Sequence, residues 1–116
     1  MYEQISGLIR PMVTPFRVDG SIDEAALRAD TRYLIDTANV HGLAVCGSTG
    51  EGHTLSTEET RQITAVTTEE TDGRVPVITG IIVNSTASVI ERGRAVSDLG
   101  VAALQVAPVF YPVSAG

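Results

Sequence analysis

Residues 47–52 read Gly47-Ser48-Thr49-Gly50-Glu51-Gly52 and connect a short apolar segment, 43–46, to a segment of helical periodicity. Glycines allow the backbone to approach a ligand closely, and Ser48 and Thr49 add hydroxyl groups. At the carboxyl end of a strand, such hydroxyls and the free N–H groups before a helix form a small anion site that suits a carboxylate. The same residues fit a simple flexible turn equally well, so the loop alone leaves both interpretations open.

On both sides of this loop, short apolar segments alternate with longer segments of helical periodicity. We predict strands over residues 8–14, 43–46, 75–80 and 101–106. The capping residues expected at the starts of the helices are Asp23, Ser56 with Glu59, and residues 84–86. The glycines expected to end the helices in the left-handed conformation are Gly42, Gly73 and Gly100. The inner face of the third helix is predicted at Val89, Ile90, Val96 and Leu99.

This order predicts a parallel sheet with helices on its outer face, because crossovers between parallel strands are right-handed. An open doubly wound sheet and part of a closed barrel both fit. A nucleotide-binding open sheet carries its glycine-rich loop after the first strand, whereas here the loop follows the second. An eight-unit barrel needs about 250 residues, so 116 residues correspond to roughly half of one. We therefore predict an α/β fold, the N-terminal half of a (β/α)8 TIM barrel, as a single domain over residues 1–116 with no internal boundary.

Two features of such a half barrel follow from its strands. Its first and fourth strands would be open edges, a liability unless another segment covers them. The first strand should be irregular, because Pro11 and Pro15 provide no backbone N–H for pairing.

Charge and composition exclude several classes of partner. The net charge of −6 leaves no basic stripe for nucleic acid or for an anionic membrane surface. No apolar run is long enough to span a bilayer, and the first residues lack the basic start of a secretion signal. A single cysteine, Cys46, fits a reducing compartment, so we expect a cytoplasmic protein. No Cys/His cluster has metal-ligand spacing, and we predict neither a metal nor a cofactor.

Lysine is missing from the sequence. The Lys+Arg total is 8, and the chain contains eight arginines. The glycine-rich loop is therefore no Walker loop, which needs a lysine. Any reaction that requires a lysine amine is impossible within these 116 residues.

Four motifs occur in order along the chain: Val13-Thr14-Pro15-Phe16, Gly47-Ser48-Thr49-Gly50-Glu51, Arg74-Val75-Pro76-Val77-Ile78, and a proline followed by aromatic residues after the fourth strand. In this order and spacing they resemble the family of dihydrodipicolinate synthase and N-acetylneuraminate lyase, the pyruvate-handling class I aldolases. The resemblance covers nearly all of residues 5–116.

The resemblance implies a complete (β/α)8 barrel whose sixth strand carries a lysine that forms a Schiff base with pyruvate or another 2-oxo acid. A tyrosine on the fifth strand would relay protons, and a homodimer or homotetramer is expected. The carboxylate-binding loop maps onto Gly47, Ser48, Thr49 and Gly50. The full-length protein would then be a lyase, and the 116-residue chain alone should be inactive.

The sequence departs from the family pattern after the fourth strand. Dihydrodipicolinate synthases usually have a relay tyrosine, lent by a neighbouring subunit, at the place of Phe110. Phenylalanine cannot transfer a proton. Either Tyr111 therefore replaces that tyrosine as the relay, or the relay is built differently. In both cases Phe110 is expected only to contact the substrate. This departure favours a sugar-acid or other 2-oxo-acid aldolase or dehydratase. A second departure is Ile81-Ile82-Val83, where the family tends to have small polar residues.

The competing hypothesis is a non-catalytic half barrel that binds small carboxylates or self-associates through its edges. Four other residues carry weaker expectations. We expect Cys46 to belong to the core and the Glu51 carboxylate to bond loop N–H groups. His41 is expected near a helix C-terminus, and His53 either lines a substrate channel or lies on the surface.

Overall fold

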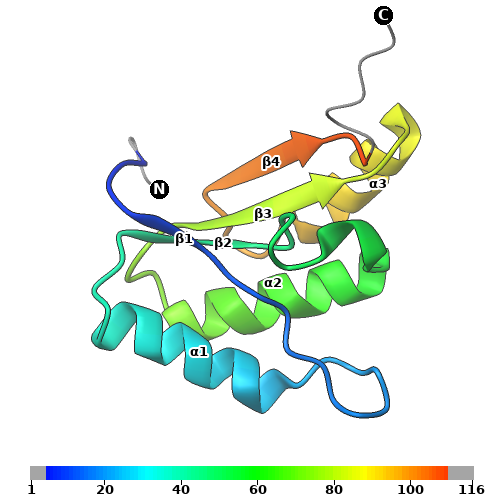
Figure 1. The fold of residues 1–116 in the computed structure, drawn as a ribbon. Coiled ribbons are helices and arrows are strands. Elements are labelled where there is room, and N and C mark those ends of the chain that lie inside the picture. Colours follow the sequence, from blue (N-terminus) through cyan, green and yellow to red (C-terminus); the bar gives the residue numbers. More distant parts are fainter. Residues whose placement is uncertain (1–4, 110–116) are drawn as a thin grey trace, which may run out of the picture.

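The computed structural model describes residues 5–109, in which helices and strands alternate along the chain (Figure 1). The elements are β1 (Ile9–Pro11), α1 (Glu24–Asp36), β2 (Gly42–Val45), the 3-10 helix η1 (Gly52–Thr54), α2 (Thr57–Thr71), β3 (Val77–Ile82), α3 (Thr86–Val96) and β4 (Ala103–Ala107). The strands form one sheet in the order β1-β2-β3-β4, and each neighbouring pair is parallel. Sequential parallel strands with helical crossovers are the arrangement of a TIM barrel, so the predicted fold class is confirmed.

The core lies between the helices and the outer face of the sheet. Leu43 and Val45 of β2 alternate with the inward Ala44 and are almost fully buried, as are Leu27 of α1 and Ile63 of α2. Alternate residues of a strand point to opposite faces, so one face of β2 packs on the helices while the other is free to line a site. Burial of both faces was expected for β2, and its residues are buried or half-buried throughout.

The starts of the helices are as predicted. The Asp23 carboxylate accepts a hydrogen bond of 3.0 Å from the backbone N–H of Ala26. Ser56 and Glu59 form a complete capping box, in which each side chain accepts from the other residue's backbone N–H. Ser85 caps α3 by accepting from the Ser88 N–H. These bonds satisfy N–H groups that have no partner inside the helix.

The prediction for Gly42 was wrong, because Gly42 is the first residue of β2 and α1 ends earlier, at Asp36. The left-handed residue of this connection is Asn39, with φ of 54°. Gly42 is instead enclosed by neighbours, since an added Cβ would lie 2.7 Å from Ile9 Cδ1. By contrast, Gly73 has φ of +75° directly after α2, as expected.

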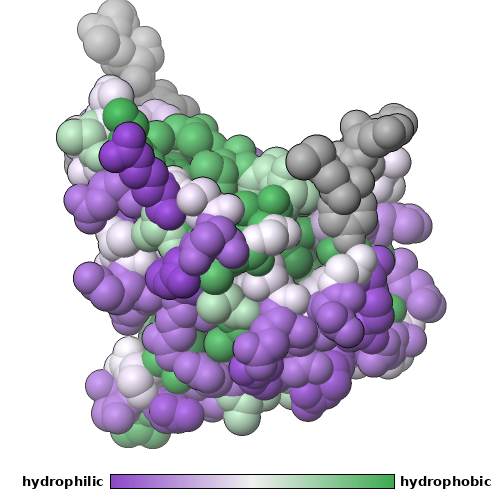
Figure 2. Space-filling view, turned by 180° about the vertical axis from the view of Figure 1, so that it is seen from behind, coloured by the Kyte–Doolittle hydropathy of each residue, from purple (hydrophilic) through white to green (hydrophobic). Residues whose placement is uncertain are grey.

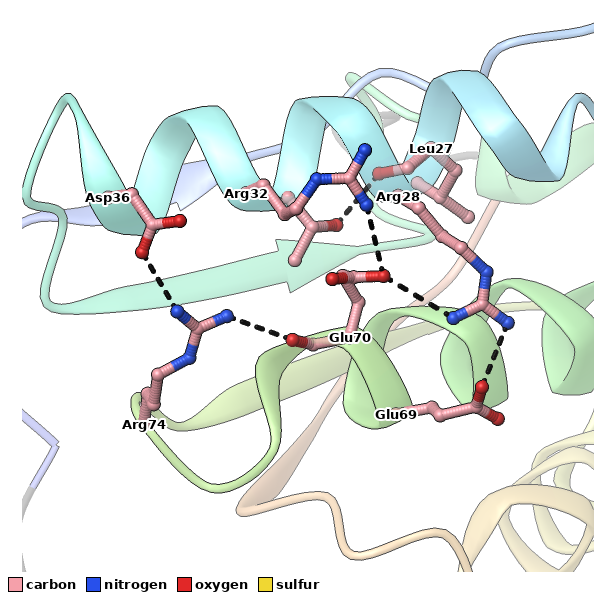
Figure 3. Close-up of polar contacts among 8 residues, drawn as sticks. Leu27, Arg28, Arg32, Asp36, Glu69, Glu70 and Arg74 are labelled. Atoms are coloured by element: carbon pink, nitrogen blue, oxygen red, sulfur yellow. Dashed lines mark hydrogen bonds and ion pairs between the residues drawn. The ribbon is translucent and has the colours of Figure 1, made fainter.

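Ion pairs join α1 to α2 on the side of the helices away from the sheet (Figure 3). The pairs are Arg28 with Glu69 and Glu70, Arg32 with Glu70, and Arg74 with Asp36, at 2.8–3.5 Å. Between α2 and the end of α3, Arg61 binds both carboxylate oxygens of Asp98, at 2.6 and 3.1 Å. These partly exposed pairs fix how the helices align rather than supplying much stability.

Candidate functional site

The loop after β2 is a tight, internally bonded turn. Cys46 leaves the strand with φ of 59°, and Glu51 enters η1 with φ of 58°. Between them the Gly52 N–H donates to the Gly47 carbonyl at 2.9 Å, and the Glu51 N–H donates to the Ser48 carbonyl at 3.1 Å. The chain is thereby folded back at the carboxyl end of β2, the edge at which parallel α/β proteins bind their ligands.

A threonine from the end of β1 holds this loop. Thr14 is 8% exposed, and its Oγ1 donates a hydrogen bond of 2.6 Å to the Gly50 carbonyl. Thr14 was predicted only as the last residue of the first strand, and its contact with the loop could not be predicted because Gly50 lies 36 residues further along the chain. The loop is thus bonded to the neighbouring strand.

Close backbone contacts explain the glycines of the loop. A Cβ atom on Gly50 would lie 2.8 Å from the Met12 carbonyl oxygen. A Cβ atom on Gly52, or on Gly80 of β3, would collide with the Cys46 carbonyl. Gly50 lets the loop pack against the segment after β1, Gly52 lets it fold back on Cys46, and Gly80 lets it pack against β3, contacts that a simple flexible turn would not require.

A pocket of about 290 Å3 lies at the carboxyl ends of the four strands. The loop contributes four residues to it, Gly47, Ser48, Thr49 and Gly50. The strands and the residue after β1 contribute Pro11, Met12, Ala44, Gly80, Ile82, Gln105 and Ala107. The structure therefore brings together the four loop residues that the sequence predicted, and none of the lining residues is ionisable. Viewed from behind, hydrophobic residues gather in the hollow at the top of the molecule, and hydrophilic residues cover most of the lower part (Figure 2).

Gln105 and Ile82 line the pocket but were not predicted as site residues. Gln105 follows an apolar residue and precedes another within the fourth predicted strand, and this alternation was the available signal. Ile82 was noted only as a departure from a family pattern. The predicted relay Tyr111 and the predicted contact Phe110 both lie outside the described residues.

Cys46 is a core residue, as expected, and 1% of it is exposed. Burial raises the pKa of the Cys46 thiol to about 12, although Arg92 and the hydroxyls of Thr64 and Thr60 oppose the shift. A thiol with such a pKa stays protonated at neutral pH and is a poor nucleophile. Cys46 therefore serves packing and not covalent chemistry.

Three other polar residues near the loop, Glu51, His53 and His41, were also given expected roles. The Glu51 carboxylate makes no capping bond to η1, so its predicted role was wrong; the Glu51 carbonyl is what accepts, from the Thr54 hydroxyl at 2.8 Å. His53 is exposed and is absent from the pocket lining, which places it on the surface. His41 Nδ1 accepts from the Leu8 N–H at 2.8 Å, joining the chain before β1 to the start of β2.

No group of three or more His, Cys, Asp or Glu side chains lies close enough together to hold a metal ion within residues 5–109. Among the helices of the same residues, none has the length and apolar character needed to cross a membrane.

Comparison with known proteins agrees with this geometry. Residues 4–116 match the dihydrodipicolinate synthetase family. The 4-hydroxy-tetrahydrodipicolinate synthase of Methylobacterium radiotolerans is 39% identical over 115 residues, covering 97% of this chain and 38% of the relative. That of Stenotrophomonas maltophilia is 40% identical over 114 residues, with the same two coverages. The chain thus spans about two fifths of the length of the curated relatives it matches.

Solved structures agree as well. A putative dihydrodipicolinate synthetase from Pseudomonas aeruginosa superposes with a TM-score of 0.86 at 36% identity, covering 96% of this chain and 38% of that one. N-acetylneuraminate lyase from Fusobacterium nucleatum gives 0.85 at 33% identity, with coverages of 95% and 38%. By its sequence and its fold, the chain belongs to the dihydrodipicolinate synthetase family.

Proposed function

We propose that the full-length protein is a cytoplasmic lyase that forms a Schiff base with pyruvate or another 2-oxo acid, and that the Gly47–Gly50 loop binds the carboxylate of this substrate. The observation that carries the proposal is the pocket at the carboxyl ends of the strands, to which all four loop residues contribute. Membership of the family supports the reaction class. The same resemblance supports assembly into a homodimer or homotetramer.

The chemistry of the pocket suits a small anion. None of its eleven lining residues carries a charge, so no carboxylate in the described part of the wall would repel the substrate's own. Ser48 and Thr49 are exposed at the mouth of the loop, and their hydroxyls would donate to the bound carboxylate. Hydrogen bonds to a charged group are about twice as strong as those between neutral groups.

The reacting amine must come from outside these 116 residues, because all eight of their basic residues other than histidine are arginines. A desolvated lysine loses its preference for the charged form and attacks the 2-oxo carbon, releasing water as the iminium forms. In cleavage, the iminium accepts the electron pair of the bond that breaks next to it and becomes an enamine. In bond formation, the iminium first loses an α-proton, and the resulting enamine donates the electron pair to the new bond. In this scheme Tyr111 would relay protons and Phe110 would contact the substrate.

Reductive trapping tests the proposal. The full-length gene product is incubated with pyruvate and sodium borohydride, and the protein is then weighed and its peptides mapped. We expect one adduct, on a lysine, for the full-length protein. The 116-residue chain should form no side-chain adduct, because it has no lysine and its only primary amine is the N-terminus. Failure of several 2-oxo acids to modify any lysine of the full-length protein would exclude the aldolase reaction.

A second function, self-association of a half barrel that does not catalyse, is favoured by the open edges of the sheet. On β4 the exposed fraction is 41% for Leu104 and 56% for Val106. Exposed strand edges with apolar side chains promote pairing with another chain. Analytical ultracentrifugation of the 116-residue chain, with and without Val106→Lys, tests this. A dimer that the substitution abolishes would support it, and a monomer at all concentrations would exclude it.

A further inference from the structure

One polar side chain projects from β4 into the pocket. Leu104 turns toward the helices, and an added Cβ on Gly93 of α3 would lie 3.5 Å from its Cδ1 atom. Successive residues of a strand face opposite sides of the sheet, so Gln105 faces the inner side, where it lines the pocket with Ala107. Gln105 is therefore part of the wall that the proposed substrate meets.

The register of the sheet places Gln105 beside the loop. Gln105 pairs with Gly80 across β3 and β4. Gly80 is the residue over which the loop folds, since an added Cβ there would lie 3.0 Å from Gly47 Cα. Neighbouring strands are about 4.8 Å apart, so Gln105 stands about one strand spacing from Gly80, the residue that the loop covers. Its side-chain amide can therefore reach a molecule that the loop holds.

The surroundings of Gln105 leave its amide available. It is exposed, and it makes no side-chain hydrogen bond to any residue between 5 and 109. The other strand residues of the wall are apolar or lack a side chain: Pro11, Ala44, Gly80, Ile82 and Ala107. A neutral amide both donates and accepts hydrogen bonds, so it suits a hydroxyl or carbonyl oxygen of a ligand. It does not favour a ligand that carries a second charged group besides its carboxylate.

We infer that Gln105 determines substrate specificity at this site. Its amide forms a hydrogen bond to a neutral oxygen on the part of the substrate beyond the 2-oxo acid group, and Ile82 and Ala107 contact the carbon chain of that part. The inference rests on the proposed function of the loop. The substrate class is a 2-oxo acid with hydroxyl groups on its uncharged remainder. A site with a polar group placed for a hydroxyl disfavours the analogue that lacks it, because the polar group then loses its partner.

Schiff-base trapping on the full-length protein tests this with two acids that differ by one hydroxyl, 4-hydroxy-2-oxobutyrate and 2-oxobutyrate, with pyruvate as reference. The half-saturating concentration for borohydride adduct formation is measured by mass, which separates the adducts. For Gln105→Leu we expect a rise of about tenfold for the hydroxylated acid. For 2-oxobutyrate and pyruvate the change should stay within about twofold.

Gln62→Leu is the matched control, because it makes the same change on α2, where the Gln62 amide binds Glu24 at 2.7 Å outside the pocket. It should leave all three values unchanged. If pyruvate forms no adduct with the wild-type protein, the proposed function fails and the inference with it. If adducts form but Gln105→Leu leaves selectivity between the two acids unaltered, the inference alone is overturned.

Discussion

At the scale of single residues, Gly50 and Gly52 of the loop are required by contacts and not by backbone angles. The residues with positive φ at its two ends are Cys46 and Glu51, whereas Gly50 and Gly52 do not adopt positive φ. What these glycines provide is room for the Met12 and Cys46 carbonyls. The sequence indicated the glycine-rich loop but not this reason, because the Met12 carbonyl comes from a segment distant in the chain and the Cys46 carbonyl approaches Gly52 only when the loop folds back.

Substituting two glycines of the loop separates crowding from flexibility. Gly52→Ala would place a methyl group on the Cys46 carbonyl, whereas Gly47→Ala meets no atom within 4 Å and requires no positive φ. We expect Gly52→Ala to lower the free energy of unfolding by about 1–3 kcal/mol, the usual cost of overpacking. Gly47→Ala should change it little. Urea unfolding measures both, and equal losses would contradict the packing account.

The hydroxyls of the loop can be tested in the same protein. Ser48→Ala combined with Thr49→Val in the full-length protein should weaken 2-oxo acid binding by about 1.5–3 kcal/mol for each lost bond to the carboxylate. Isothermal titration measures the affinity, and circular dichroism checks the fold. Ser97→Ala with Thr57→Val makes the same changes outside the pocket and should leave the affinity unaltered. An unchanged affinity in the loop variant would place the carboxylate site elsewhere.

At the scale of helices and strands, local signals predicted starts better than ends and faces. The capping residues Asp23, Ser56 and Ser85 were correctly identified because a cap depends on neighbours within a few residues. The predicted inner face of α3 was correct at Val96, which is buried, and wrong at Ile90, which is 48% exposed. The helix period does not reveal that α3 lies at the edge of the described helical layer, packed against α2 on one side only.

The capping box of α2 gives a prediction at this scale. Ser56→Ala removes the acceptor for the Glu59 N–H, now bonded at 3.0 Å. The free energy of unfolding should fall by about 1 kcal/mol. Ser56→Asp retains an acceptor and should restore most of that loss in thermal or urea unfolding. A loss of the same size in both variants would show that the hydroxyl is not acting as a cap.

The Arg61–Asp98 pair predicts a dependence of stability on pH. Hydrogen bonding to Arg61 lowers the pKa of Asp98 in the folded state. The pair therefore stabilises the fold above the unfolded-state pKa of about 4, and the contribution is lost as pH falls through the lower folded value. In urea unfolding, Asp98→Asn should reduce stability at neutral pH and flatten the loss on acidification. An acid profile identical to that of the wild type would contradict this.

At the scale of the whole molecule, the sequence predicted more of the fold than of the residues that line the site. The positions of the strands and of the loop indicated half a barrel, and four pocket residues followed from the loop. The place of Gln105 in the pocket could not be predicted, because the face of the sheet on which Gln105 lies depends on the register of β4. A shift of one residue would turn Leu104 inward instead. The chain spans 38% of its relatives' length, which leaves the reacting lysine to be found in the full-length protein.

The central claim is that the Gly47–Gly50 loop binds the carboxylate of a 2-oxo acid. A crystal structure of the full-length protein, reduced with borohydride in the presence of pyruvate, measures this directly. We predict the carboxylate of the lysine adduct within hydrogen-bonding distance of the Ser48 or Thr49 hydroxyls or of the loop N–H groups. An adduct whose carboxylate is bound by other residues, with the loop unoccupied, would contradict the claim.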